Sequence, residues 1–295
     1  ASYQAISATG AKPISCDINK ENLIISLKDA EKRITKKTKA IMPVHFAGHV
    51  GNLNQIYKFA KKFKLRVIED AAHAFGTVYM KKRIGSFGDV VCFSFDGIKN
   101  ITSGEGGCVV SKNKKFLKKI KDARLLGVVN DTEKRFGGKR SWLFDVKDQG
   151  WRYHMSEINA AIGLAQLKRF RKLSSKRKSI CKIYDKILLK NKKIYIFKRN
   201  YNKEVPHIYV VRIKNLVKRS LLRKDLLKKG IQTGLHYFPN HKLSKYREKN
   251  SRKLYNAEKI STEVITLPLH PDLSKTKIFF ITNILNKLLS KDKYF

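Results

Sequence analysis

The sequence predicts an α/β protein in which a large domain with a mostly parallel sheet is followed by a small C-terminal α+β domain. Through the first half of the chain, short apolar runs alternate with segments in which apolar residues recur at helical spacing. This alternation is typical of parallel strands covered by helices. A chain of 295 residues, 42% of them hydrophobic, is long enough for two packed units. The pattern changes near residue 170, so we expect the large domain over residues 1–170 and the small one over 171–295.

The first half of the chain contains one well-marked helix among its apolar runs. Asn52 is a suitable N-cap for a helix over Leu53–Phe63, in which apolar residues recur at helical spacing. The short apolar runs bounded by turn residues are expected strands, because strands buried on both faces show no polar alternation. These strands are Thr38–Phe46, Leu65–Asp70, Asp89–Phe95 and Gly106–Ser111.

A long polar segment punctuated by glycines, Gly127–Gly150, precedes the second half, and we interpret it as a functional or flexible loop. Ser156 then caps an expected helix over residues 157–170. The apolar face of this helix consists of Ile158, Ala161, Ile162, Ala165 and Leu167. The small domain is expected to contain a separate basic helix after residue 172, a strand over His207–Ile213, a helix over Arg219–Lys229 closed by Gly230, and a C-terminal helix over Lys275–Leu289.

The chain is strongly basic, with 65 Lys and Arg against 23 Asp and Glu and a net charge of +42. The basic run Lys168–Lys193 lacks regularly interleaved aromatics for base stacking, so a solvated or anion-attracting surface is favoured over nucleic-acid binding. No apolar run is long enough to predict a membrane span. Four scattered cysteines without metal-ligand spacing indicate a reducing cytoplasm and predict no metal site.

Polar residues follow two of the expected strands. Asp70 ends one strand and His73 comes shortly after it, while Ser94 lies at the end of the next strand and Lys99 follows. Ligands of open α/β sheets bind beyond the carboxyl ends of the strands. Taken singly, these residues could be a helix cap, a core histidine, a packed serine and a loop lysine. Together they match pyridoxal 5′-phosphate (PLP), since an amine can form a Schiff base with its aldehyde and a carboxylate can keep its pyridine nitrogen protonated.

Six consecutive motifs resemble those of the DegT/DnrJ/StrS nucleotide-sugar aminotransferases. They are PVHFAGHVGNLNQI, VIEDAAHAFG, IGSFGDVVCFSFDGIKNITSGEGG, YHMSEINAAIGLAQL, GIQTGLHYFPNH and ITLPLHPDLS. The resemblance runs through nearly the whole chain and implies the aspartate-aminotransferase-like fold of PLP fold type I. Members of that family carry a further segment before the point where this chain begins. We therefore expect either a fragment of an intact enzyme or a truncated product.

The resemblance also implies roles for individual residues. Lys99 would be the lysine that forms the Schiff base with PLP and moves the proton, and Asp70 would pair with the pyridinium nitrogen. His73 would lie beside the ring oxygen, and Ser94 would contact the phosphate. Arg152 and His154 occupy the segment that in the family reaches the cofactor phosphate of the partner subunit, where asparagine is usual. His236, Tyr237 and His241 would line the sugar side.

The function implied by the resemblance is transfer of an amino group from L-glutamate to a nucleotide-linked keto-sugar, for polysaccharide or glycoconjugate biosynthesis. The enzyme would work in the cytoplasm as a homodimer with shared active sites. One alternative is a non-catalytic member of the same fold that binds PLP or a sugar nucleotide, or that serves as a structural dimer partner. A second alternative, of another class, is a basic nucleic-acid-binding protein.

Overall fold

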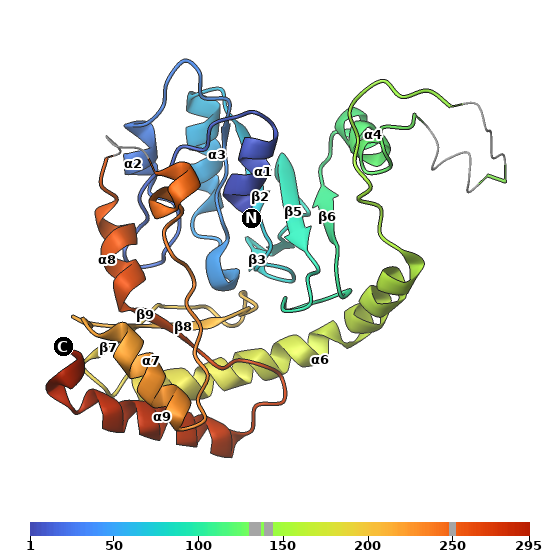
Figure 1. Ribbon diagram of the computed structural model, residues 1–295. Coiled ribbons are helices and arrows are strands. Elements are labelled where there is room, and N and C mark those ends of the chain that lie inside the picture. Colours follow the sequence, from blue (N-terminus) through green and yellow to red (C-terminus); the bar gives the residue numbers. More distant parts are fainter. Residues whose placement is uncertain (130–136, 139–143, 248–251) are drawn as a thin grey trace.

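The computed structural model describes residues 1–129, 137–138, 144–247 and 252–295 (Figure 1). The described residues form a four-stranded sheet in the first half of the chain and a three-stranded sheet in the second, besides a two-stranded hairpin. Part of the predicted loop Gly127–Gly150 lies outside the described residues. No helix in the described ranges is long and apolar enough to cross a membrane.

The four-stranded sheet is built, in spatial order, from β1 (Ala40–Ile41), β2 (Arg66–Asp70), β5 (Val90–Ser94) and β6 (Gly107–Val110). Strands β1, β2 and β5 run parallel and β6 is antiparallel to β5, so the prediction of a mostly parallel sheet is confirmed. β1 is much shorter than the predicted strand Thr38–Phe46. Pro43 interrupts that run because it has no N–H to donate to a neighbouring strand.

Helix α3 (Leu53–Lys62) packs against this sheet and begins where the sequence predicts. The Asn52 side chain accepts a hydrogen bond of 3.1 Å from the Gln55 N–H, and the helix buries one apolar face. The remaining elements of this half are helices α1 (Ser2–Ala8), α2 (Leu27–Glu31) and α4 (Lys114–Ala123), and the hairpin of β3 (Val78–Tyr79) and β4 (Lys82–Arg83).

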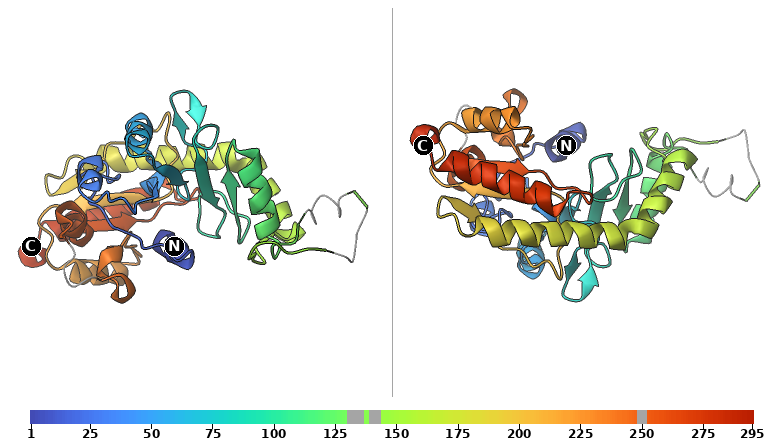
Figure 2. Two further views of the ribbon diagram at one scale, coloured as in Figure 1. Left: turned by 90° about the horizontal axis from the view of Figure 1, so that it is seen from above. Right: turned by 90° about the horizontal axis from the view of Figure 1, so that it is seen from below.

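Helix α6 (Glu157–Leu188) is a single helix of 32 residues, where the sequence predicted two. Ser156 caps it as predicted, accepting a hydrogen bond from the Asn159 N–H. No glycine or proline lies between Gly163 and the end of the helix, so nothing in the sequence stops it near residue 170. The predicted domain boundary falls inside this helix and stays a prediction. Figure 2 shows α6 spanning the molecule from the region of α4 to the second sheet.

The second sheet has the order β7 (Ile194–Ile196), β8 (Tyr209–Ile213) and β9 (Val264–Leu267), with antiparallel neighbours. One face packs against α6, α7 (Arg219–Lys228) and α9 (Lys275–Leu289), while the opposite face contributes Val210 to a smaller cluster with α8 (Tyr255–Glu263). The bounds of α9 are those predicted. Gly230 follows α7 with φ of +75°, as expected for its predicted capping position.

The two halves of the molecule are joined by specific polar contacts. Asp17, from the first half, accepts hydrogen bonds of 3.0 and 2.8 Å from the backbone N–H groups of Asn256 and Ala257 in α8. His49 forms a hydrogen bond of 2.8 Å with Glu204, which lies between β7 and β8. These contacts attach α8 and the segment before β8 to the first half of the chain.

Candidate active site

The carboxyl ends of β2 and β5 form the base of the site. Asp70 and Ser94 are the last residues of these parallel strands, and Asp70 is aligned with Cys92 in the register. Because side chains alternate along a strand, Ser94 projects to the same face as Cys92, two residues earlier. The backbone therefore brings the predicted carboxylate and hydroxyl to one edge and one face of the sheet.

The Asp70 carboxylate is held from two sides. The Ser2 hydroxyl donates a hydrogen bond of 2.6 Å to one carboxylate oxygen, and the Ala72 N–H donates one of 3.2 Å to the other. The preceding residue, Glu69, points to the opposite face, where its buried carboxylate pairs with His45 at 2.7 Å. The end of β2 is thus anchored on both faces, and this anchoring fixes the direction of the Asp70 side chain.

His73 is buried and occupies the centre of the site. Its Nδ1 accepts a hydrogen bond of 3.3 Å from the Ala47 N–H, and its Nε2 lies 3.1 Å from the Tyr237 hydroxyl. Ala47 has a positive φ of 58° in the turn that presents this N–H. Burial lowers the pKa of His73 to about 3, with a contribution from the nearby Lys99 ammonium. His73 is therefore neutral at physiological pH.

Lys99 is half-buried in the loop between β5 and β6. Its positive charge lowers the pKa of His73, and also those of His207 and His236, so the amine lies among three imidazoles. Within the described residues its amine has no hydrogen-bond or ion-pair partner. The next residue, Asn100, is 5% exposed and donates a hydrogen bond of 3.2 Å to the Phe75 carbonyl, which anchors the loop.

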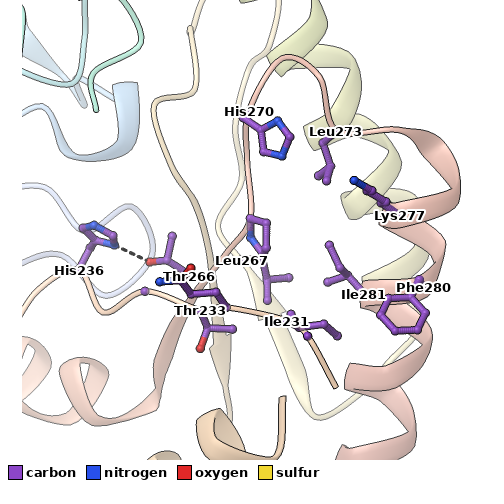
Figure 3. Close-up of a pocket in the computed structure, with 14 residues that line it drawn as sticks. Ile231, Thr233, His236, Thr266, Leu267, His270, Leu273, Lys277, Phe280 and Ile281 are labelled. Carbon is purple, nitrogen blue, oxygen red and sulfur yellow. Dashed lines mark hydrogen bonds between the residues drawn. The ribbon is translucent and has the colours of Figure 1, made fainter. Parts of the chain in front are cut away.

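His236 and Tyr237 reach the site from the second half of the chain. The Tyr237 hydroxyl contacts His73, and burial raises its pKa to about 12, with a contribution from the Asp70 charge. His236 Nδ1 lies 2.8 Å from the Thr266 hydroxyl. Figure 3 shows His236 at one end of a cavity of about 610 Å³ that continues between β9 and α9. Both predicted residues are therefore at the site, although they lie far from Lys99 in the sequence.

His207 belongs to the same group and was missed by the sequence analysis, which placed it only at the start of a strand. It is 4% exposed, its ring centroid lies 4.2 Å from that of His73, and its Nδ1 is buried without a hydrogen-bond partner among the described residues. No local pattern distinguishes it from a strand residue. Within the described ranges, no group of His, Cys, Asp and Glu side chains is placed to hold a metal ion.

Three predicted residues lie outside this group. Arg152 is exposed and pairs through its backbone with Leu125, beyond the end of α4, and His154 follows in the same segment. His241 instead forms a hydrogen bond of 3.2 Å with Glu258 at the start of α8. Among the described residues, no hydrogen bond joins any of the three to Lys99, Asp70 or His73. Their predicted roles remain predictions.

Comparison with known proteins identifies the class of protein that this fold and site define. The sequence profile of the DegT/DnrJ/EryC1/StrS aminotransferase family matches residues 1–286, and the chain belongs to this family. An uncharacterized protein of Methanocaldococcus jannaschii, MJ1066, is 37% identical over 291 residues, which are 96% of this chain and 75% of that protein.

Two solved structures place the chain more narrowly. The aminotransferase PseC of Helicobacter pylori, involved in the biosynthesis of pseudoaminic acid, is 29% identical with a TM-score of 0.88, over 96% of this chain and 75% of PseC. Spr1654 of Streptococcus pneumoniae, described as a putative sugar aminotransferase and solved in its PMP form, is 27% identical with a TM-score of 0.88, over 97% of this chain and 78% of that one. The chain is a PLP-dependent sugar aminotransferase of fold type I.

The residues of the site fit this cofactor. The Lys99 amine, which has no partner in the described part of the chain, suits an aldehyde. The Asp70 carboxylate, fixed at the end of a central strand, suits a pyridinium nitrogen, and the Ser94 hydroxyl on the same sheet edge suits a phosphate. The buried imidazoles are neutral, so they add hydrogen-bonding capacity without adding positive charge beside the amine.

Proposed function

We propose that this protein transfers an amino group from L-glutamate to a keto-sugar linked to a nucleotide, in the biosynthesis of a polysaccharide or glycoconjugate. The observation that carries the proposal is the Lys99 amine, which has no partner among the described residues and lies near His73 beyond the carboxyl ends of the parallel strands. An amine without an ion-pair partner is free for covalent attachment and proton transfer.

Each residue of the site has a proposed task. When bound, PLP supplies an electron sink that stabilises negative charge on the carbon losing a proton. Lys99 would attach the cofactor through its amine and move the proton at the reacting carbon. Asp70 would hold the ring nitrogen in its protonated form, Ser94 would donate to the phosphate, and His73 would donate or accept beside the ring oxygen.

The charge of the molecule supports a nucleotide diphosphate as the anionic part of the substrate. The net charge of +42 raises the local concentration of polyanions around the protein. Arg152 and His154 are proposed to bind the phosphate of a cofactor held by a second copy of the chain, because cations suit phosphate oxygens. On the sugar side we propose His236, Tyr237 and, in the adjoining segment, His241.

A homodimer is part of this proposal. The first half of α6 exposes the face that the sequence predicted to be apolar, with Ile158 76% and Ile162 42% exposed. The neighbouring segment exposes Trp151 and Tyr153, whose rings stack at 6.1 Å. Exposed aromatic and aliphatic side chains that recur along one segment and the helix after it are typical of an interface. The cytoplasm is the proposed location, because all four cysteines are free thiols.

A panel assay tests the reaction. The protein is incubated with PLP, L-glutamate and UDP-, dTDP- or GDP-linked keto-sugars, and the amino-sugar is detected by mass spectrometry. We expect product with one class of nucleotide and none when the free sugar replaces it. If PLP binds and glutamate leaves its spectrum unchanged, the alternative of a non-catalytic member of the fold is favoured. Tight DNA binding that weakens steeply with salt would instead favour the nucleic-acid alternative.

A further inference from the structure

Two buried imidazoles, those of His73 and His207, contact each other between the two halves of the chain. The rings of His73 and His207 lie 4.2 Å apart between centroids, with an interplanar angle of 46°, and they are 5% and 4% exposed. His73 follows β2 and His207 precedes β8, so the contact joins the two sheets. The His207 carbonyl accepts a hydrogen bond of 3.1 Å from Arg177 of α6, which fixes the backbone at this point.

The hydrogen bonds of His73 have a defined direction. The Ala47 N–H can only donate, so His73 Nδ1 must be the unprotonated nitrogen that accepts. A neutral imidazole then carries its proton on Nε2, and this N–H donates to the Tyr237 oxygen at 3.1 Å. The Tyr237 hydroxyl keeps its own proton, which is available to a second acceptor.

This arrangement depends on His73 staying neutral. A protonated imidazole would carry a proton on Nδ1, and this proton would point at the Ala47 N–H. Burial is the main cause that lowers the pKa of His73 to about 3 and that of His207 to about 2. The titratable groups that face the two rings are Asp70, Lys99, Arg177, His236 and Tyr237. Of these, only Asp70 favours a charged His73.

We propose that His207 is a positioning residue: its ring shields the His73 imidazole from water and so fixes the hydrogen bond that His73 donates to Tyr237. The consequence is a Tyr237 hydroxyl whose proton is directed to an oxygen of the cofactor or the sugar. That consequence rests on the proposed function. The arrangement of His73 itself depends only on residues of this chain.

The tautomer of His73 can be measured without PLP or sugar. The protein is labelled with 15N-histidine, and long-range 1H–15N spectra are recorded between pH 5 and 8, with His73→Gln used to assign the resonance. We expect a neutral ring protonated on Nε2 throughout this range. If His73 in the unmodified protein titrates within this range, or if it carries its proton on Nδ1, the proposal is overturned.

Two substitutions separate shielding from a general loss of structure. In His207→Ala the ring is removed and water can enter, so we expect the pKa of His73 to rise by about two units or more, and the ring then begins to protonate at the acid end of the pH range. In His207→Phe the aromatic wall is kept, and the His73 resonance should match that of the unmodified protein. An unchanged His73 in His207→Ala contradicts the proposal. Because the samples contain neither cofactor nor substrate, the outcome does not depend on whether the panel assay detects the proposed reaction.

Discussion

Lys99 differs from the other lysines of the chain in its surroundings. Most lysines are exposed on this basic molecule, whereas Lys99 is half-buried, beside a buried Asn100 and among the imidazoles of His73, His207 and His236. These imidazoles resist protonation, so they do not add to the positive charge around the amine. Within the described residues the Lys99 amine has no counter-ion, so it is accessible for covalent attachment to an aldehyde.

The first prediction concerns this amine. Replacing Lys99 with alanine should abolish the visible absorbance that PLP acquires when it is attached to a lysine, and should lower the rate of amino transfer by at least about a thousandfold. Lys99→Arg should behave in the same way, because it keeps the charge and loses the nucleophile. Spectra and single-turnover rates measure both effects. Lys115→Ala, on the exposed surface of α4, is the matched control, and retention of the band in Lys99→Ala would refute the assignment.

The helix α8 shows how one element depends on another that is distant in the sequence. Its own N-cap residue, Leu254, has no side chain that can accept a hydrogen bond. The Asp17 carboxylate supplies the cap instead, with one oxygen to each of the first free N–H groups, on Asn256 and Ala257. The negative charge is also favourable at this end of the helix.

We therefore predict that Asp17→Ala lowers the free energy of unfolding by about 1–2 kcal/mol, as measured by urea denaturation. Asp17→Asn should cost less, because its amide oxygen can still accept a hydrogen bond. Ser290→Ala, at the exposed end of α9, should change stability by less than about 0.5 kcal/mol and serves as the control. Equal stability of Asp17→Ala and the unmodified protein would show that α8 needs no cap from the first half of the chain.

The elements that the sequence predicts correctly are those with local signals at both ends. The bounds of α9 follow from Ser274 as cap and from its apolar spacing, and α3 begins at Asn52 for the same reason. The apolar composition of residues 38–46 predicts a longer strand than β1, because it takes no account of Pro43, which has no N–H to donate to a neighbouring strand. The change in charge pattern near residue 170 predicts a boundary between two helices, but α6 continues through it, because charge alone does not end a helix.

In the candidate site, too, the sequence predicts the residues that neighbouring strands bring together and misses a residue that only tertiary packing brings there. Asp70 and Ser94 end adjacent parallel strands and Lys99 follows the second of them, so the rule that parallel strands end at one edge is sufficient to group these residues. His207 lies more than a hundred residues beyond His73, and only the packing of the second sheet brings the two rings together. Periodicity describes which face of an element is apolar, but it does not show which other element covers that face.

At the scale of the whole molecule, the exposed face of α6 predicts a dimer. Ile162→Glu should raise the dimer dissociation constant by at least about tenfold, because a charge would be buried in an apolar contact. Sedimentation equilibrium measures this change directly. Val217→Glu introduces the same charge at a residue that is 73% exposed in the loop after β8, and it should leave the constant unchanged. A monomeric unmodified protein at micromolar concentration would contradict the proposed dimer.

The buried imidazoles also predict how the stability of the whole molecule depends on pH. In the unfolded chain, His73 and His207 become protonated as the pH falls below their ordinary pKa of about 6.5. In the folded state, burial lowers the pKa of His73 to about 3 and that of His207 to about 2, so both remain unprotonated at pH 5.5. The unfolded state therefore binds more protons as the solution is acidified, and the free energy of unfolding falls. Between pH 7.5 and 5.5 each imidazole should contribute a loss of roughly 1.4 kcal/mol.

Urea denaturation at the two pH values measures this loss, and a variant isolates one of the two imidazoles. His207→Phe cannot take up the proton in the unfolded state, so its loss of stability between pH 7.5 and 5.5 should be smaller by roughly 1.4 kcal/mol. The carboxylates with lowered pKa are Asp29, Asp89, Asp225 and Glu258, and they lose their stabilising contribution only below about pH 4.5, outside this window. An identical pH dependence in His207→Phe and in the unmodified protein would mean that His207 is protonated in the folded state as readily as in the unfolded chain.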